Sequence, residues 1–225
     1  MSQITERLKN VKGRIEAAAQ KSGRASADIK LVAVTKNADV EAVSQAYEAG
    51  LRIFGESRVQ EAEPKILNLN RPDIEWHLIG HLQSNKVKAA VSLFQMIQSV
   101  DSVRLAEKIS IEAAAGPKPL LLQVNISGEA QKYGFKPEEI YMAIERVSAF
   151  PNIQVLGLMG MAPNGVSDDI KRAAFKKLKS IFSVCKTLKK DNVKMQCLSM
   201  GMSDDFEMAI EEGSSMVRLG RALFA

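Results

Sequence analysis

The chain has 225 residues, and its 31 lysines and arginines against 26 aspartates and glutamates give a net charge of +5 at pH 7. Hydrophobic residues make up 46% and charged residues 25%, which excludes a disordered chain, a collagen and a disulfide-stapled scaffold. The charge excess is small, only 5% of residues are aromatic and the basic residues are scattered, so a nucleic-acid-binding protein is disfavoured.

The location of the protein is suggested by three further features. No run of about 18 apolar residues is present, so we expect no membrane span. The N-terminal segment lacks the apolar centre of a signal peptide. The two cysteines, Cys185 and Cys197, form no C-x-x-C pair. Together these features favour a reduced, cytoplasmic protein, with an organellar location left open.

Hydrophobic patterning predicts helices and strands in alternation. The first segment spaces Ile4, Leu8, Val11, Ile15 and Ala18 by three or four positions, which predicts an amphipathic N-terminal helix. Short runs rich in Val, Ile and Leu follow, and several are almost wholly apolar, as parallel strands buried on both faces are. The predicted strands are 31–35, 51–54, 75–79, 96–100, 120–125, 154–159, 195–199 and 216–219.

The segments between these strands carry helix start signals. Asp39 is expected to cap one helix, and Asp101 or Ser102 another. Pro137 is expected just inside a helix start, and Ser167 just before the longest helix. The apolar stripe of that longest helix is predicted to comprise Ile170, Ala174, Leu178, Ile181, Cys185 and Leu188.

Eight strand–helix units in a chain of this length predict an α/β fold. We expect a TIM-type (β/α)8 barrel, a single domain over residues 1–225 with an extra N-terminal helix. A doubly wound open sheet is the alternative, but its G-x-G-x-x-G fingerprint follows none of the strands.

Lys36 directly follows the first predicted strand, and functional residues of such barrels lie at the C-terminal ends of the strands. A lysine that is partly desolvated there has a lowered pKa and becomes a nucleophile that forms Schiff bases with aldehydes. A solvated loop lysine is the alternative interpretation. Lys132, which follows the fifth strand, is a rival for the same role.

The loops after the seventh and eighth strands, 199–205 and 218–222, occupy the place where barrels often bind phosphate. Ser203 is expected to cap a helix that begins near Asp204 and to donate to a phosphate oxygen, although Asp204 and Asp205 would repel an anion. Ordinary turn chemistry is the alternative. Two glycines that permit close backbone approach and two arginines complete the predicted site: Gly201, Gly220, Arg218 and Arg221. A phosphorylated aldehyde such as pyridoxal phosphate would bridge this site and Lys36.

His77 and His81 lie four residues apart, but His77 falls in a strand and no carboxylate or cysteine completes a zinc set. We therefore expect His77 to have a structural, hydrogen-bonding role and predict no metal site. The methionines near the strand ends are expected to line the core and the mouth rather than to bind metal: Met159, Met161, Met200 and Met202.

Motifs along nearly the whole chain resemble those of one family. They are LVAVTK at 31–36, FGESRVQE at 54–61, WHLIGHLQSNK at 76–86, NISGEAQKYGF at 125–135, GLMGMAP at 157–163, LSMGMSDDFEMAI at 198–210 and VRLGRALF at 217–224. On these residues the chain resembles the pyridoxal phosphate homeostasis proteins and, more distantly, the N-terminal barrel of alanine racemase.

The resemblance implies that Lys36 holds pyridoxal 5′-phosphate as a Schiff base and that Arg218 faces its pyridine nitrogen. A guanidinium does not give up its proton, so the ring nitrogen would stay unprotonated and the ring would be a weak electron sink. The resemblance also places Ser203, Gly220 and Arg221 around the phosphate. Ser57, Met200 and Gly201 are the other expected cofactor-binding residues. The chain departs from the family at Ser57, where Asn is usual, and ends at Ala225 without the usual Gly-x-Arg segment.

Racemases of this class carry a second domain that places a catalytic tyrosine over the cofactor, whereas this chain ends at its eighth predicted strand. Of its three tyrosines, only Tyr133 falls in a loop near the mouth. The resemblance therefore implies a non-enzymatic, monomeric carrier or regulator of pyridoxal phosphate in vitamin B6 and amino-acid homeostasis, with apo-enzymes as recipients. The alternatives are a pyridoxal phosphate-dependent amino-acid racemase or isomerase acting through Lys36 and Tyr133, and a lysine-dependent aldolase acting on a phosphorylated sugar.

Overall fold

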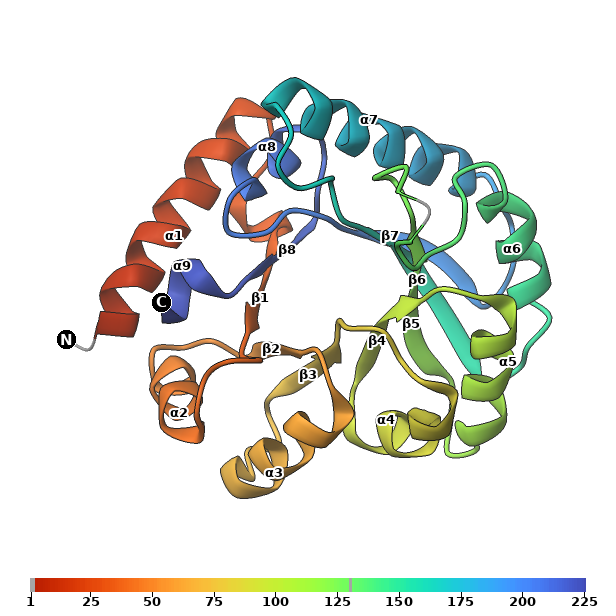
Figure 1. Cartoon of the computed structure of the whole chain (residues 1–225), viewed down its shortest axis with the longest axis horizontal. Coiled ribbons are helices and arrows are strands. Elements are labelled where there is room, and N and C mark those ends of the chain that lie inside the picture. The colour runs from red at the N-terminus through yellow and green to blue at the C-terminus, as the bar shows by residue number, and fades with distance from the viewer. Residues whose placement is uncertain (1–2, 130) are drawn as a thin grey trace.

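Eight parallel strands close into a barrel in the order β1-β2-β3-β4-β5-β6-β7-β8, with the helices in a ring around them (Figure 1). The computed structural model describes residues 3–129 and 131–225. The strands are β1 Lys30–Val34, β2 Ile53–Glu56, β3 Glu75–Leu78, β4 Met96–Val100, β5 Lys118–Val124, β6 Ile153–Gly160, β7 Val193–Ser199 and β8 Met216–Leu219. The predicted barrel is thus confirmed.

The helices follow the strands in alternation, after one that precedes the barrel. They are α1 Gln3–Lys21, α2 Val40–Glu48, α3 Val59–Leu69, α4 Val87–Leu93, α5 Val103–Glu112, α6 Ile140–Val147, α7 Asp168–Cys185, α8 Phe206–Glu211 and α9 Arg221–Phe224, with short 3-10 turns at Ser26–Asp28 and Ser84–Lys86. Within the described residues, none of these helices has the length and apolar character needed to cross a membrane.

All eight predicted strands are present; β1 is displaced by one residue and β2 by two. Leu51 belongs to the turn that closes α2, because its N–H donates to the carbonyl of Ala46. Ser167 directly precedes α7, as predicted, and two predicted side-chain caps are confirmed. The Asp39 carboxylate accepts from the N–H of Ala42 at 2.8 Å, and Ser102, not Asp101, caps α5.

Two predictions about helices are wrong. Pro137 does not start α6, because residues 136–139 form a turn before it, in which the N–H of Glu139 donates to Lys136. The predicted stripe of α7 is partly rotated: Ile170 is 51% exposed, while two phenylalanines that the stripe omitted are buried. The buried face is Ala174, Phe175, Leu178, Phe182 and Cys185, since the aromatic rings bury more area than Ile170 would. Also, α1 with 19 residues exceeds α7 with 18.

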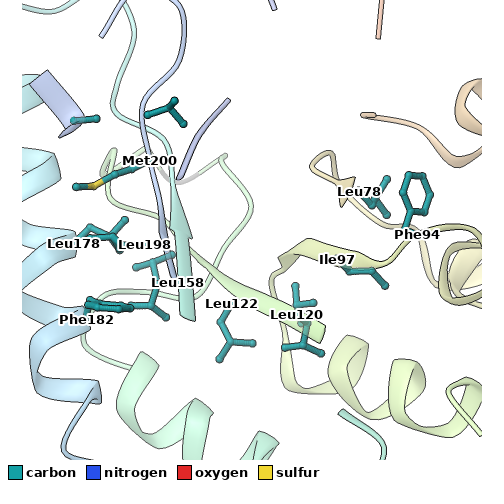
Figure 2. Close-up of a cluster of buried hydrophobic side chains, with 14 of the residues drawn as sticks. Leu78, Phe94, Ile97, Leu120, Leu122, Leu158, Leu178, Phe182, Leu198 and Met200 are labelled. Atoms are coloured by element: carbon teal, nitrogen blue, oxygen red, sulfur yellow. The ribbon is translucent and has the colours of Figure 1, made fainter. Parts of the chain in front are cut away.

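The main hydrophobic core lies between the outer surface of the barrel and the helices. Figure 2 shows part of this layer, in which strand residues such as Leu158 and Leu198 face Leu178 and Phe182 of α7. A second, small cluster of Met96, Leu121 and Met159 packs separately from that layer.

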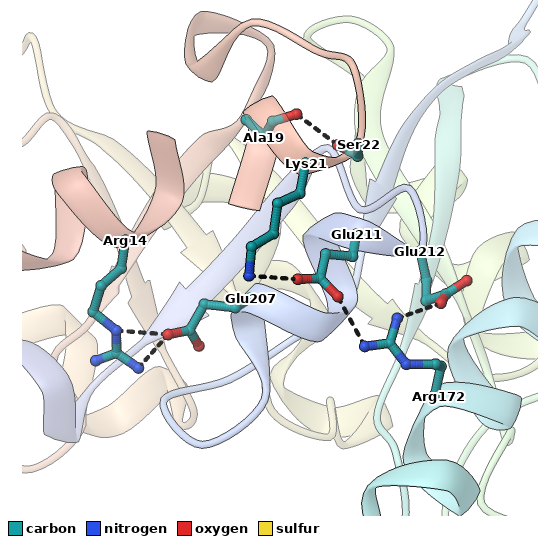
Figure 3. A network of polar contacts seen from close by, with 8 residues as sticks. All are labelled: Arg14, Ala19, Lys21, Ser22, Arg172, Glu207, Glu211 and Glu212. Carbon is teal, nitrogen blue, oxygen red and sulfur yellow. Dashed lines mark hydrogen bonds and ion pairs between the residues drawn. The ribbon is translucent and has the colours of Figure 1, made fainter. Parts of the chain in front are cut away.

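Ion pairs fix α8 between the helices on either side of it (Figure 3). Arg14 of α1 pairs with Glu207 at 2.6 Å, and Arg172 of α7 pairs with Glu211 at 2.8 Å and Glu212 at 2.6 Å. Lys21 of α1 also reaches Glu211, at 3.5 Å. Because α8 follows β7, these pairs hold the loop after β7 at the mouth of the barrel.

Candidate functional site

Lys36 lies at the mouth, two residues beyond β1. Successive strand side chains alternate between faces, and Ala33 packs into the outer core, so Val32, Val34 and Lys36 share the inner face. The Lys36 side chain is exposed in a pocket of about 320 Å³. The pocket is lined by the end of β1, the start of α2 and the end of the chain: Val34, Lys36, Asn37, Ala38, Asp39, Ala42, Gly220, Arg221, Phe224 and Ala225. The structure therefore brings Lys36 together with Gly220 and Arg221, as predicted.

A buried ion pair lies behind Lys36, on the outer face of the barrel. Lys65 of α3 donates from Nζ to the carbonyl of Thr35 at 2.6 Å and to Glu56 Oε1 at 2.8 Å. The Thr35 hydroxyl also donates to Glu56 Oε1, at 2.7 Å. Glu56 is fully buried, and its Oε2 has no partner among the described residues. This cluster was not predicted from the sequence, where its one signal is a carboxylate at the end of a strand with apolar residues.

The loops after β7 and β8 are bonded to each other. The Ser203 hydroxyl accepts from the N–H of Ala222 at 3.2 Å, and Arg221 forms an ion pair with Asp204. Arg221 is 72% exposed, so solvent screens this pair. A side chain at position 220 would lie 3.3 Å from the carbonyl of Val34, so glycine allows the close approach of the β8 loop to β1.

The predicted helix cap at Ser203 is wrong. Helix α8 begins at Phe206 with Asp205 at the N-cap position. Asp205 closes a turn instead: its Oδ1 accepts from the N–H of Met202 at 2.6 Å, and its own N–H donates to the Met202 carbonyl. This turn takes up residues 202–205 and leaves the Ser203 hydroxyl to the β8 loop.

Met200 and Gly201 join the barrel to α8. Met200 is fully buried in the core beside Leu178 and Leu198 (Figure 2), so it forms part of the wall and does not line the Lys36 pocket. Gly201 has φ of +96°, and a side chain there would lie 2.6 Å from the Cβ of Ala209. Only glycine fits this conformation and this contact. Met159 is also fully buried, as predicted for the core.

Arg218 lies inside the barrel and does not line the Lys36 pocket. Its Nη1 donates to Ser199 Oγ at 2.6 Å and its Nη2 to the carbonyl of Gly160 at 3.1 Å. Burial lowers the pKa of Arg218 to about 10, and the charge of Asp205 acts in the opposite direction. The guanidinium is therefore still a cation at neutral pH. Arg218 pairs in register with Val32, so it shares the inner face with Lys36.

Ser57 lines a different pocket from Lys36, one of about 590 Å³ between the loops after β2 and β3. A side chain at Gly80 would lie 2.2 Å from the Ser57 carbonyl, so the two loops touch through their backbones. In the same region His81 bonds Asp101 at 2.9 Å, and the ring of Tyr133 stacks on it at 3.7 Å. Tyr133 thus reaches the mouth, as predicted, but lines neither the Ser57 pocket nor the Lys36 pocket.

The remaining candidates have structural partners. His77 is fully buried and is hydrogen-bonded at both ring nitrogens, to Glu75 and Gln98, which confirms its structural role. Lys132 pairs with Glu129 at 2.6 Å. Within residues 3–129 and 131–225, no group of three or more His, Cys, Asp or Glu side chains is arranged to hold a metal ion.

Comparisons with known proteins agree with this architecture. Residues 7–225 match the family described as alanine racemase, N-terminal domain. The pyridoxal phosphate homeostasis protein of Pseudomonas aeruginosa is 42% identical over 226 residues, which cover 100% of this chain and 96% of that protein.

Two solved structures extend the comparison. PipY of Synechococcus elongatus, solved with PLP bound, aligns with a TM-score of 0.86 at 34% identity, over 99% of this chain and 100% of PipY. The alanine racemase of Clostridium difficile aligns with a TM-score of 0.74 at 17% identity, over 97% of this chain and 56% of the racemase, and shows only the shared fold. The chain therefore belongs to the alanine racemase N-terminal domain family and, within it, to the pyridoxal phosphate homeostasis proteins.

Proposed function

We propose that this protein binds pyridoxal 5′-phosphate at the mouth of the barrel and acts as a carrier or regulator of the cofactor in vitamin B6 and amino-acid homeostasis. The observation that carries the proposal is that Lys36 lines one pocket with Gly220 and Arg221, so an amine, a guanidinium and a loop glycine share that pocket. The names of the relatives and the PLP-bound structure of PipY support it.

The residues at the site fit the two ends of this cofactor. The Lys36 amine would attach to its aldehyde as a Schiff base, and Ser203, Gly220 and Arg221 would hold its phosphate. Because Asp204 already pairs with Arg221, the phosphate would compete with that carboxylate for the guanidinium. Gly201 and Met200 would support the phosphate loop from behind.

The pyridine nitrogen would face Arg218, as the resemblance implies. Arg218 is in register with Val32, four residues before Lys36, which corresponds to about 13 Å along an extended strand. In the proposed complex the cofactor ring would lie between these two side chains. Ser57, in the neighbouring pocket, would contact the cofactor only from the loop after β2.

The mouth favours a carrier over a racemase. A racemase needs a second acid or base positioned on the other face of the cofactor. Tyr133 is 56% exposed, and its ring is occupied in stacking on His81. We therefore infer no racemase or isomerase turnover. The proposal also includes a monomeric, cytoplasmic protein that passes the cofactor to apo-enzymes.

The test starts with a visible absorption spectrum of the protein after incubation with pyridoxal phosphate. Borohydride reduction and peptide mapping should place the label on Lys36. Lys36→Ala should abolish the visible band, whereas Lys132→Ala should retain it. A label on another lysine, or a colourless protein as the aldolase alternative requires, would overturn the proposal. Loss of optical rotation with a panel of amino acids would instead support the racemase alternative.

A further inference from the structure

A continuous series of hydrogen bonds crosses the interior of the barrel; we call it the interior chain. Arg218 Nη1 donates to Ser199 Oγ at 2.6 Å, and Ser199 Oγ donates to Gln98 Oε1 at 2.7 Å. Gln98 Nε2 then bonds His77 Nδ1 at 2.8 Å, and His77 Nε2 bonds Glu75 Oε1 at 2.8 Å. Strands β4 and β7 are not neighbours, so the bond between Gln98 and Ser199 spans the barrel.

The two ends of the interior chain fix its direction. A guanidinium only donates hydrogen bonds, and an ionised carboxylate only accepts them. Because Ser199 accepts from Arg218, its single proton is left for Gln98 Oε1. Each later group must then donate away from Arg218 and toward Glu75. The pKa of Glu75 is lowered chiefly by the hydrogen bond from His77, which agrees with an ionised acceptor at this end.

A separate contact fixes the orientation of the Gln98 amide. Gln98 Nε2 lies 3.2 Å from Met216 Sδ, and a thioether sulfur only accepts. The amide nitrogen therefore faces both Met216 and His77, and its oxygen faces Ser199. His77 must accept at Nδ1 and carry its proton on Nε2.

The interior chain is buried along most of its length. Ser199, Gln98 and His77 are completely inaccessible to solvent, and Arg218 is nearly so. Glu75 is the exception, with a side chain 38% exposed at the N-terminal end of β3. A break in the middle would leave buried polar groups without partners, which is costly where water cannot replace them.

We propose that Ser199, Gln98 and His77 are positioning residues that hold the Arg218 guanidinium for the pyridine nitrogen of the cofactor. The proposal rests on the proposed function, because it needs the cofactor ring beside Arg218. The polar side chains inside the barrel would then have a role in cofactor binding. They hold the guanidinium through a series of oriented hydrogen bonds that ends on the Glu75 carboxylate.

The first test uses variants loaded with pyridoxal phosphate. Gln98→Met removes both the carbonyl and the NH2 group of the side-chain amide at similar volume. Ser199→Ala removes the hydroxyl that accepts the hydrogen bond from Arg218. Both should still be labelled at Lys36, but with a shifted absorption maximum and a dissociation constant raised about tenfold, the effect of one lost hydrogen bond to a charged group. Gln123→Met is the matched control. It also removes a buried glutamine side chain, which in the described residues bonds only the Tyr133 carbonyl, and it should leave the absorption maximum unchanged.

The second test needs neither a variant nor the cofactor. ¹⁵N NMR of the histidines in the cofactor-free protein should show a pyridine-type Nδ1 and a pyrrole-type Nε2 for His77. The opposite tautomer would overturn the interior chain even if pyridoxal phosphate binds to Lys36. Unchanged spectra and affinities in Gln98→Met and Ser199→Ala would overturn its positioning role. Failure of the wild-type protein to take up the cofactor would instead contradict the proposed function. The expected His77 tautomer would in that case still support the direction of the hydrogen bonds in the interior chain.

Discussion

Lys65 Nζ lies 2.6 Å from the carbonyl oxygen of Thr35, the residue that directly precedes Lys36. The Lys65 side chain is only 12% exposed, and its counterion, Glu56, is fully buried. The contact joins α3 to the last residue before the candidate nucleophile. It fixes the peptide from which Lys36 projects, and it does so from the outer face of the barrel, away from the pocket.

Removing Lys65 alone should be strongly destabilising. Lys65→Met leaves the Glu56 carboxylate buried without its cation, a change that typically costs about 3 kcal/mol of the free energy of unfolding. The double variant Lys65→Met/Glu56→Leu should recover most of that loss, because two apolar side chains can replace a buried ion pair. Urea unfolding of the three proteins measures both effects.

Arg58→Met provides the control for this prediction. Arg58 pairs with Glu61 at 2.7 Å, but its side chain is 74% exposed. Exposed ion pairs contribute little to stability, so the free energy of unfolding of this variant should lie within about 0.5 kcal/mol of the wild-type value. A similar loss in Lys65→Met and Arg58→Met would show that Glu56 does not depend on its buried partner.

Two glycine substitutions should have opposite effects. Gly157 lies in β6 with φ of +154°, where the register with both neighbouring strands shifts, and a side chain there would lie 1.7 Å from the Cys197 carbonyl. Gly157→Ala should therefore lower the free energy of unfolding by about 3 kcal/mol or more. Gly13 lies in the exposed face of α1 with nothing within 4 Å, so Gly13→Ala should raise it by roughly 0.5–1 kcal/mol. Equal effects in thermal unfolding would contradict the close approach at Gly157.

The alternation of apolar runs was enough to predict the barrel, because strands buried on both faces have few other interpretations. Lys36 could be placed at the mouth for the same reason: it follows a strand, and the fold determines which end is the mouth. The interior chain could not be predicted in this way. Its members Gln98 and Ser199 are 101 residues apart and meet only because the barrel closes.

The loop after β7 shows a different limit of sequence reasoning. Ser203, Asp204 and Asp205 are all good N-cap residues, and local preference does not choose among them. The choice is made by the turn that Asp205 closes on Met202 and by the N–H of Ala222, which arrives from the β8 loop. The Glu56–Lys65 pair was missed because nothing in the sequence of α3 says that Lys65 points inward.

Neither cysteine should react in the folded protein. Burial raises the pKa of both Cys185 and Cys197 to about 11, so at pH 8 the reactive thiolate should be about a hundredfold scarcer than for an ordinary thiol. A disulfide reagent such as Ellman's reagent should therefore titrate no thiol rapidly in the native protein and two after unfolding in guanidinium. One rapid equivalent in the native protein would mean that the surroundings of one of these two cysteines open to solvent.

The ion pairs that hold α8 should contribute to the free energy of unfolding, by an amount that depends on salt and pH. Arg172 pairs with both Glu211 and Glu212, and its side chain is 36% exposed, so solvent screens the pairs in part. Arg172→Ala should therefore cost about 1 kcal/mol at low ionic strength, and less in 1 M salt. The hydrogen bond from Arg172 lowers the pKa of Glu211 below its ordinary value of 4.5. A carboxylate with a lowered folded pKa stabilises the protein above the unfolded pKa, and that contribution is lost as the pH falls through the folded value. The difference in unfolding free energy between wild type and Arg172→Ala should thus be constant near neutral pH and shrink below about pH 4.5.

Urea unfolding across this pH range measures the difference. Lys136→Ala is the control, because it breaks an exposed pair with Glu139 away from α8. A difference that stays constant as the pH falls would mean that Arg172 acts on α8 through packing and not through the Glu211 carboxylate.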